Sequence, residues 1–152
     1  MPNINSIRHF SWLSSEQEAR LFHQVPLDFP RHGELERLAV ALGATLYMPA
    51  TRPTIAHDLQ TLAGRGVVSA VLCLEDAIPD AAIRDAERNL VSQLRELAAV
   101  VTSRSCALPL VFIRVREASQ IARVVEDAGD ASALVSGFVL PKFSPEIGRA
   151  HV

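Results

Sequence analysis

The sequence lacks the features that mark a membrane, secreted or nucleic-acid-binding protein. Its clearest apolar run, Val67–Leu74, has the length of a strand and not of a membrane span. The N-terminal residues show no basic and apolar segments of a secretion signal. No basic run with interleaved aromatics is present, and the formal net charge is −2. We therefore predict a cytoplasmic protein with neither a membrane nor a nucleic-acid partner.

Motifs for zinc, dinucleotide or nucleophilic chemistry are also missing. The two cysteines, Cys73 and Cys106, lack metal-type spacing and are too few for a disulfide framework. We expect free thiols, with Cys73 packed inside an apolar strand. The five histidines form no His-x-x-x-His pair, which argues against zinc. No nucleophile elbow and no glycine-rich phosphate turn occur, so hydrolase and dinucleotide sites are not expected.

Four apolar runs, each followed by polar or charged residues, are the most informative feature that is present. They span residues 45–49, 67–74, 110–113 and 137–140, and stretches of helical length separate them. Consecutive parallel strands have this pattern when their C-terminal ends build a polar pocket. An open doubly wound sheet, including a small flavodoxin-like domain, is the alternative. We predict an α/β fold that forms the N-terminal half of a (β/α)8 TIM barrel, with four parallel strands.

A helical lead-in over residues 1–44 is expected to precede the partial barrel of residues 45–146. A capping-box pattern at Ser14 starts one helix, and a second over Gly33–Leu42 places apolar residues on one face. That face comprises Leu35, Leu38, Ala39 and Leu42. The expected strands are Thr45–Met48, Val67–Leu74, Leu110–Val115 and Phe138–Leu140, and helices are expected to begin at Thr54, at Pro79 and near Ile121.

The ends of these runs carry four short motifs. They are Leu46-Tyr47-Met48-Pro49-Ala50-Thr51-Arg52-Pro53, Leu74-Glu75-Asp76-Ala77-Ile78, Ile113-Arg114-Val115-Arg116 and Leu140-Pro141-Lys142. In this order they resemble the HpcH/HpaI aldolase and citrate lyase beta-subunit-like superfamily, with Ala50 in place of its usual glycine. The lead-in and the Ala50-Thr51 variant are most similar to the branch of C–C bond lyases of the TIM-barrel fold, which is associated with tellurium-resistance gene clusters.

The resemblance implies a magnesium-dependent carbon–carbon lyase or aldolase. Its substrate would be a small anionic 2-oxo or 3-hydroxy acid, or a thioester of CoA or an acyl carrier, and the reaction would pass through a metal-stabilised enolate. The full-length parent is expected to be a homo-oligomer. The family's metal ligands, a glutamate and an aspartate, belong to strands five and six. We therefore expect no metal ligand in this chain and no activity of the 152-residue chain by itself.

By the same resemblance, Glu75, Asp76 and Arg114 are catalytic residues. The carboxylates would orient metal-bound water, and the guanidinium would bind a substrate carboxylate or an enolate oxygen. Because side chains alternate along a strand, the two carboxylates are expected to point in roughly opposite directions. The alternatives are that Asp76 caps the turn before Pro79, and that Arg114 forms only a salt bridge to Glu75, Asp76 or Glu117.

Tyr47, Arg52, Arg114 and Arg116 are predicted to bind substrate. The resemblance places Tyr47 and Arg52 at the mouth of the substrate or thioester site. Tyr47 could instead be a half-buried strand aromatic, and Arg52 could pair with a surface carboxylate. Arg116 replaces the family's usual asparagine, which could favour a more anionic substrate. Lys142, the single lysine, is expected to brace the barrel rim, with a Schiff-base role as the alternative.

Residues 147–152 do not continue the strand–helix pattern. One back-translation of Ile147–Val152 matches a widely used sequencing-adapter oligonucleotide, so we expect a non-native tail on a truncated gene fragment. A natural C-terminus is the alternative. A different class of function also stays open, namely a non-catalytic accessory protein that binds an anionic metabolite in a tellurium-resistance stress system. A glutamate and an aspartate on strands five and six would favour the enzyme.

Overall fold

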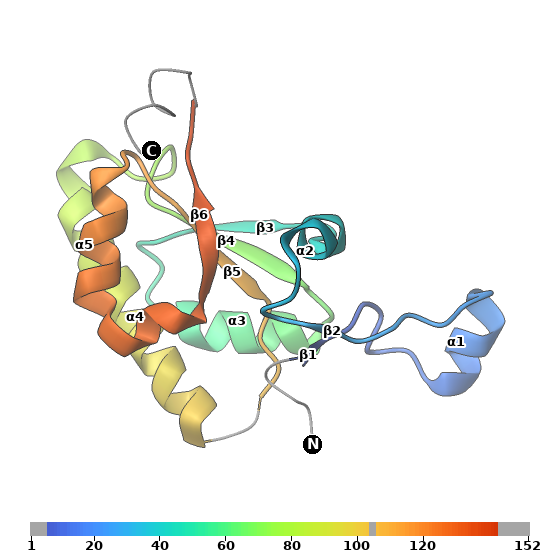
Figure 1. Cartoon of the computed structure of the whole chain (residues 1–152). Helices are drawn as coiled ribbons and strands as arrows, with labels where there is room; N and C mark the ends of the chain where they lie inside the picture. Colours follow the sequence, from blue (N-terminus) through green and yellow to red (C-terminus); the bar gives the residue numbers. More distant parts are fainter. Residues whose placement is uncertain (1–5, 104–105, 143–152) are drawn as a thin grey trace.

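A four-stranded parallel sheet forms the centre of the computed structural model, which describes residues 6–103 and 106–142. The strands are β3 (Leu46–Pro49), β4 (Ser69–Cys73), β5 (Leu110–Arg114) and β6 (Val135–Val139). They lie side by side in chain order, and every neighbouring pair is parallel (Figure 1). This arrangement confirms the predicted α/β fold and is consistent with part of a (β/α)8 barrel. The predicted tail, residues 147–152, lies outside the described residues.

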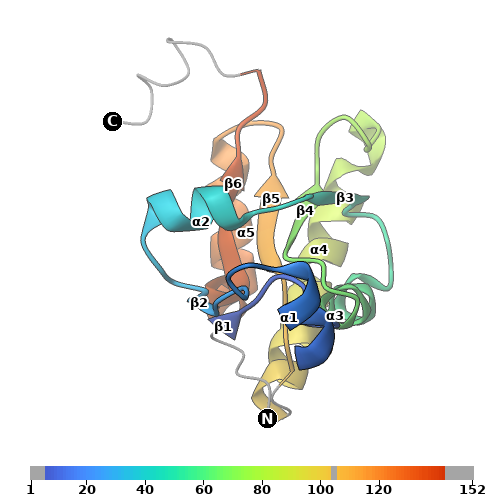
Figure 2. The ribbon, with the colours of Figure 1, turned by 90° about the vertical axis from the view of Figure 1, so that its right-hand side faces the viewer.

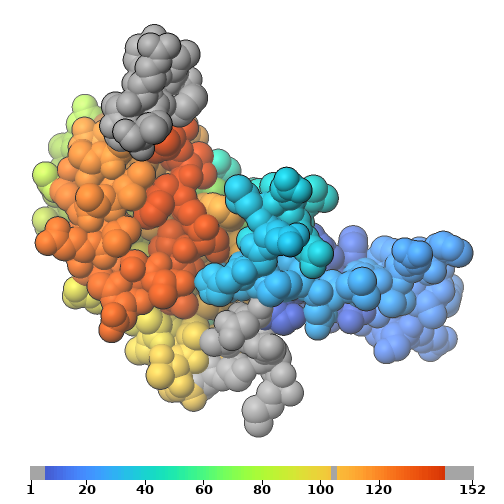
Figure 3. Space-filling view, in the orientation of Figure 1, coloured from blue at the N-terminus to red at the C-terminus, as the bar shows by residue number. Residues whose placement is uncertain are grey.

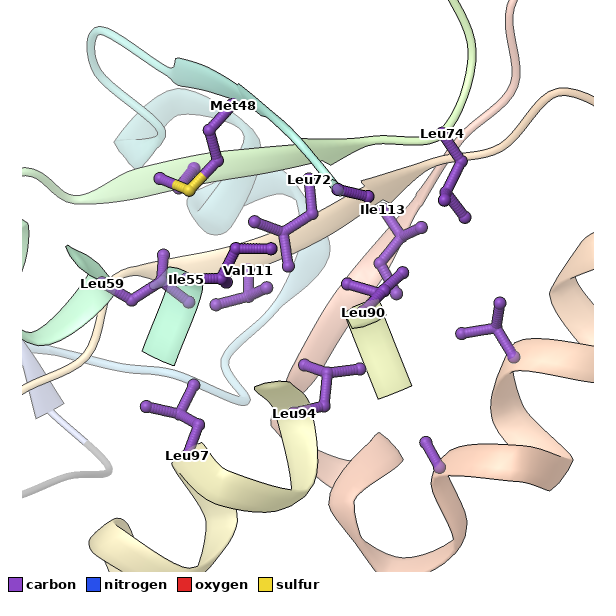
Figure 4. Packing of buried hydrophobic residues seen from close by; sticks show 14 of the residues in the cluster. Met48, Ile55, Leu59, Leu72, Leu74, Leu90, Leu94, Leu97, Val111 and Ile113 are labelled. Atoms are coloured by element: carbon purple, nitrogen blue, oxygen red, sulfur yellow. The ribbon is translucent and has the colours of Figure 1, made fainter. Parts of the chain in front are cut away.

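Three helices cover one face of the sheet. They are α3 (Ile55–Gly64), α4 (Ile83–Ser103) after the 3-10 turn η1 (Asp80–Ala82), and α5 (Ser119–Ala128), which continues into the 3-10 turn η2 (Gly129–Leu134). Leu90, Leu94 and Leu97 of α4 recur at helical spacing, and all three are fully buried against the strands (Figure 4). Burying one such side chain stabilises the fold by roughly 1.5–3 kcal/mol. This layer therefore supplies much of the driving force for folding.

The N-terminal segment covers part of the opposite face of the sheet (Figure 2). It contains β1 (Ser6–Ile7) and β2 (Phe29–Pro30), which pair antiparallel, and the helices α1 (Ser15–Leu21) and α2 (Leu35–Ala41). Ile7 and Phe29 form a second, smaller core with Val68 and with Leu110 of β5. The central strands are thus covered on both faces, which explains why every residue of β4 is buried.

Arg31 fastens the N-terminal segment to the start of β5. Its side chain is buried, and its Nη2 donates hydrogen bonds to the carbonyls of Leu108 (2.8 Å) and Pro109 (2.5 Å). Burial lowers the pKa of the Arg31 guanidinium, because the charged form loses contact with water. Carbonyl dipoles therefore compensate this buried charge at the end of the sheet opposite the predicted polar pocket.

Local features of the N-terminal segment and of the strand ends agree with the sequence-based expectation in one case and differ from it in three. The predicted capping box at Ser14 is confirmed, with reciprocal hydrogen bonds between Ser14 and Gln17. The β1–β2 pair was not predicted, because two-residue strands carry no periodic signal. Thr54 occupies the N-cap position of α3, but its hydroxyl donates to the Asp58 carboxylate (2.7 Å) and caps no backbone amide. The last strand begins at Val135, earlier than expected.

Exposed apolar side chains gather near the N-terminus of the described chain. Ten large hydrophobic residues of the described part of the chain are exposed, and nine of them lie between residues 10 and 47; they are Phe10, Trp12, Leu21, Val25, Leu27, Leu35, Val40, Leu46 and Tyr47. We call residues 6–30 the N-terminal arm, which projects from the rest of the molecule (Figure 3). Leu35 faces solvent, while Leu38 and Leu42 pack on the second core. Within residues 6–103 and 106–142, no helix is both long enough and apolar enough to span a bilayer.

Candidate functional site

The C-terminal ends of β4, β5 and β6 bring four charged side chains together. The strand register pairs Cys73 with Arg114, and Arg114 with Val139. Residues just beyond β4 and β6 therefore lie beside the end of β5. We call the four residues the charged cluster: Glu75, Asp76, Arg114 and Lys142. The predicted catalytic residues and the single lysine thus meet at one end of the sheet.

Short ion pairs join the members of the charged cluster. Arg114 Nη2 lies 2.6 Å from Glu75 Oε2 and 2.8 Å from Asp76 Oδ2. Lys142 Nζ lies 3.1 Å from Glu75 Oε1 and 4.0 Å from Asp76 Oδ1. The side chains of Glu75 and Arg114 are 8% and 23% exposed, whereas those of Asp76 and Lys142 are 62% and 79% exposed. The cluster therefore has an inner pair, the buried Glu75 and the partly buried Arg114, and a solvent-exposed outer pair.

Glu75 and Asp76 point toward the same arginine. The expectation of opposite directions is wrong, because β4 ends at Cys73 and strand alternation no longer applies beyond it. The chain turns instead: the Ile78 amide donates to the Glu75 carbonyl (3.0 Å), and the Asp76 amide donates to Glu75 Oε2 (2.9 Å). The Asp76 carboxylate accepts a hydrogen bond from Arg114, so the predicted salt bridge of Arg114 is present.

Neighbouring groups keep Glu75 ionised. Burial by itself would raise the pKa of the Glu75 carboxyl, but hydrogen bonds with Asp76 and Lys142 and the charge of Arg114 outweigh burial. The pKa of Glu75 therefore lies below its ordinary value. At neutral pH this side chain is a carboxylate that accepts hydrogen bonds, and it is not a proton donor.

Arg116 contacts the turn that follows β4. Its guanidinium forms an ion pair with Asp80. Its Nη2 donates to the carbonyls of Glu75 (3.1 Å) and Ile78 (2.6 Å). These partners all belong to the segment that leads from β4 into α4, so Arg116 joins the end of β5 to that segment.

An open pocket of about 460 Å³ lies beside the charged cluster. It is lined by Glu75, Asp76, Arg116, Pro141 and Lys142. Arg114 is not among these lining residues, and its side chain is less exposed than that of Lys142. Lys142 has a φ of 50°, which is uncommon for a residue other than glycine.

Tyr47 and Arg52 lie in a different hollow, against β3. This pocket of about 280 Å³ shares no lining residue with the pocket at the charged cluster. Arg52 forms an ion pair with Asp58, and this contact raises the pKa of Arg52 and lowers that of Asp58. The alternative of a surface carboxylate partner for Arg52 is therefore observed, and Tyr47 is 55% exposed. The predicted substrate contacts of both residues stay predictions.

Polar residues that no sequence motif indicated hold the loops around the two hollows in place. Asn89 of α4 donates to two carbonyls of the β3–α3 loop, at 2.7 and 2.9 Å. Gln120 of α5 accepts from the Arg116 amide (2.8 Å) and donates to Glu87 of α4 (2.6 Å). Gln120 and Glu87 are both buried. Gln120 and Glu87 are polar residues among the apolar positions of two amphipathic helices, and this pattern is the sequence feature that could have indicated buried hydrogen bonds.

The described residues do not by themselves fit a magnesium ion. Magnesium requires near-octahedral oxygen coordination, whereas Glu75 and Asp76 are already paired with Arg114 and Lys142. Over the described ranges, no group of three or more His, Cys, Asp and Glu side chains is placed to hold a metal ion. Magnesium stays a prediction from the resemblance.

Fold and site together define the class of protein. Helices cover the outer face of a parallel sheet, and charged side chains gather at the C-terminal ends of its strands, as in (β/α)8-barrel enzymes. The chain belongs to the family of C–C bond lyases of the TIM-barrel fold, whose family model matches residues 36–152. This membership confirms the resemblance seen in the four motifs. No curated protein and no solved structure matches the chain.

Proposed function

We propose that this chain forms the arginine–carboxylate part of a C–C bond lyase that acts on a small anionic substrate. The substrate class would be a 2-oxo acid, a 3-hydroxy acid or an acyl-thioester. Family membership supports the reaction type. The observation that carries the proposal is the mostly buried Arg114 at the C-terminal end of a parallel sheet, whose Nη2 contacts two carboxylates that line a solvent-accessible pocket.

Arg114 would bind the negatively charged oxygens of the substrate and of the enolate. A guanidinium fork matches a carboxylate and also stabilises the oxygen of a developing enolate. In the free protein Arg114 Nη2 is held by Glu75 and Asp76, whereas Nε has no hydrogen-bond partner among the described residues, so a substrate carboxylate that binds Nη2 has to replace one of the two. Asp76 is the more exposed of the two, and we expect it to be the one displaced. Glu75 would then keep the guanidinium oriented from the buried side.

The non-catalytic alternative has one observation in its favour. Arg114 and Lys142 already neutralise both carboxylates of the cluster. A site that binds an anionic metabolite would also require this, because free carboxylates repel an anion. Tyr47 and Arg52 would serve either function only if the ligand extends to the separate hollow against β3. A thioester is longer than a free 2-oxo acid and is the better candidate for such a ligand.

The test is a titration with oxalate, a planar dianion that resembles the enolate of a 2-oxo acid. We expect oxalate to perturb the guanidinium signals of Arg114 in NMR spectra. Arg114→Gln should lower the affinity at least about tenfold, because a charge-assisted hydrogen bond contributes roughly 1.5–3 kcal/mol. Arg88→Gln, which removes an exposed arginine paired with Asp85, is the matched control and should bind like the wild type.

Two outcomes would contradict the proposal: no oxalate binding by the wild-type chain, or equal affinity in Arg114→Gln. To separate the two candidate functions, oxaloacetate would be added to a longer protein that contains this chain, and its cleavage to CO2 and the enolate of pyruvate followed by CO2 release above the uncatalysed rate. Cleavage supports the lyase. Arginine-dependent oxalate binding by a full-length parent that cleaves no 2-oxo or 3-hydroxy acid supports the accessory protein.

A further inference from the structure

Arg116 binds the backbone of the turn between β4 and α4. Arg116 Nη2 donates to the carbonyl at the start of the turn, that of Glu75 (3.1 Å), and to the carbonyl of Ile78 (2.6 Å). The same guanidinium pairs with Asp80 at the start of η1. One rigid fork therefore contacts three successive points of the segment that supplies Glu75.

These contacts act on the position of the Glu75 carboxylate. The Glu75 carbonyl, bound by Arg116, also accepts from the Ile78 amide (3.0 Å), and this bond closes the turn. Within the same turn, the Asp76 amide donates to Glu75 Oε2 (2.9 Å), the oxygen that also contacts Arg114 (2.6 Å). Fixing the backbone at Glu75 thus fixes which way its carboxylate points.

Arg116 is itself anchored by buried polar groups of the helical layer. Its amide donates to Gln120 Oε1 (2.8 Å), and Gln120 Nε2 donates to Glu87 Oε1 (2.6 Å). Gln120 is 1% exposed and Glu87 is 7% exposed, so both need these partners. A continuous series of hydrogen bonds therefore runs from α4 and α5 through Arg116 to the turn that carries Glu75.

We infer that Arg116 is a positioning residue, which holds the Glu75 turn so that the carboxylate stays against Arg114, and that it is not a substrate ligand. Its Nη atoms contact two carbonyls and Asp80, and its Nε, which has no hydrogen-bond partner among the described residues, is buried from solvent, so the guanidinium has little to offer an anion in the pocket. The inference rests on the proposed function, since it treats the charged cluster as the reacting end. The test measures properties of Glu75 and of its turn and does not measure turnover. This inference and the proposed function can therefore fail separately.

The variant of choice is Arg116→Lys, which keeps the charge but loses the planar fork. Two quantities are measured by NMR on the full chain: the pKa of the Glu75 carboxyl and the exchange rates of the Asp76 and Ile78 amides. We expect the pKa of Glu75 to move up toward its ordinary value, because the carboxylate loses its fixed place beside Arg114. The two amides should exchange about tenfold faster, as expected for the loss of roughly one hydrogen bond to a charged group.

Two further variants separate positioning from general stability. Asp80→Asn removes the exposed ion pair but leaves both carbonyl contacts, so it should keep the wild-type pKa and exchange rates. Arg88→Ala, which removes an exposed arginine of α4, should do the same. Unchanged readouts in Arg116→Lys would overturn the inference. Equal changes in Arg88→Ala would also overturn it, because the effect would then come from general loosening of the fold.

Discussion

At the scale of single residues, Gly66 determines how the N-terminal arm meets the sheet layer. Its φ is +83°, and the indole ring of Trp12 lies so close that a Cβ at this position would overlap with it. Glycine adopts this backbone without strain, whereas other residues do not. The contact therefore depends on the absence of a side chain, and it ties the arm to the loop between α3 and β4.

Gly66→Ala should destabilise the chain by about 1–2 kcal/mol, the cost of left-handed backbone for a residue with a Cβ. It should also displace Trp12, the only tryptophan, so its fluorescence should shift to longer wavelength. Gly64→Ala is the matched control, since a Cβ there meets nothing within 4 Å and alanine favours the helix. Identical emission of Gly66→Ala and wild type would contradict this account of the contact.

Sequence motifs predicted the identity of the site residues better than their contacts. Glu75, Asp76 and Arg114 do come together at the strand ends, and Lys142 joins them. The directions of the two carboxylates were predicted wrongly, because the point where β4 stops depends on pairing with β5 and not on local pattern. The contact of Arg116 with the turn after β4 links positions far apart in sequence, which no motif spacing specifies.

At the scale of elements, a buried ion-pair network joins α4 to α5. Glu87 of α4 accepts from Gln120 (2.6 Å) and from Arg123 (3.2 Å), both on α5. Burial by itself would raise the pKa of Glu87, but these hydrogen bonds and the charge of Arg123 outweigh burial and place its pKa below the ordinary value. Such a network stabilises the packing of the two helices only while Glu87 is ionised.

Glu87→Gln should therefore lower the free energy of unfolding at pH 7 by about 1–3 kcal/mol, the cost of an impaired buried charged network. A carboxyl with a lowered native pKa stabilises the fold fully above its unfolded pKa of about 4.5, and this stabilisation disappears as the pH falls through the native pKa. The difference between wild type and variant should shrink on acidification below that value. Urea unfolding followed by circular dichroism at several pH values measures it.

Asp85→Asn is the control for this pH dependence. The Asp85 carboxylate is 71% exposed and pairs with Arg88 on the same helix. Exposed pairs of this kind contribute about 0–1 kcal/mol, so the control should unfold much like the wild type. A Glu87→Gln difference that stays constant from pH 7 to the acid range would contradict the role assigned to ionised Glu87.

The main strands and helices were predicted from hydrophobic periodicity, because buried parallel strands and amphipathic helices repeat their patterns over many residues. The small β1–β2 pair and the exposed position of Leu35 were not predicted. Both depend on how the N-terminal segment packs against the sheet. That packing is set by a few distant partners, among them Arg31 and the carbonyl of Leu108.

At the scale of the whole molecule, the sheet has two outer strands. Within the described residues, neither β3 nor β6 has a strand on its outer side. Outer strands offer unpaired backbone amides and carbonyls, which favour pairing with another chain. Leu46 and Tyr47 add exposed apolar side chains along β3. We therefore expect the 152-residue chain to associate with itself as its concentration rises.

Leu46→Lys should reduce this association, because a charged side chain on an outer strand opposes pairing. Val125→Lys is the matched control: Val125 has the same exposed fraction, 40%, but lies on α5. Sedimentation velocity at increasing concentrations compares the three proteins. A wild-type chain that remains monomeric would contradict the expectation. Equal effects of both lysines would show that net charge, and not the strand edge, controls association.

The single lysine of the chain has a practical consequence for labelling chemistry. Lys142 provides the only side-chain amine, and its Nζ lies 3.1 Å from Glu75. Arginine side chains do not react with acylating reagents at neutral pH, because the guanidinium stays protonated. A fluorophore delivered by such a reagent would be attached, among the side chains, only at the rim of the pocket. The native sequence thus contains a specific labelling site for a reporter dye, and no engineered cysteine is needed.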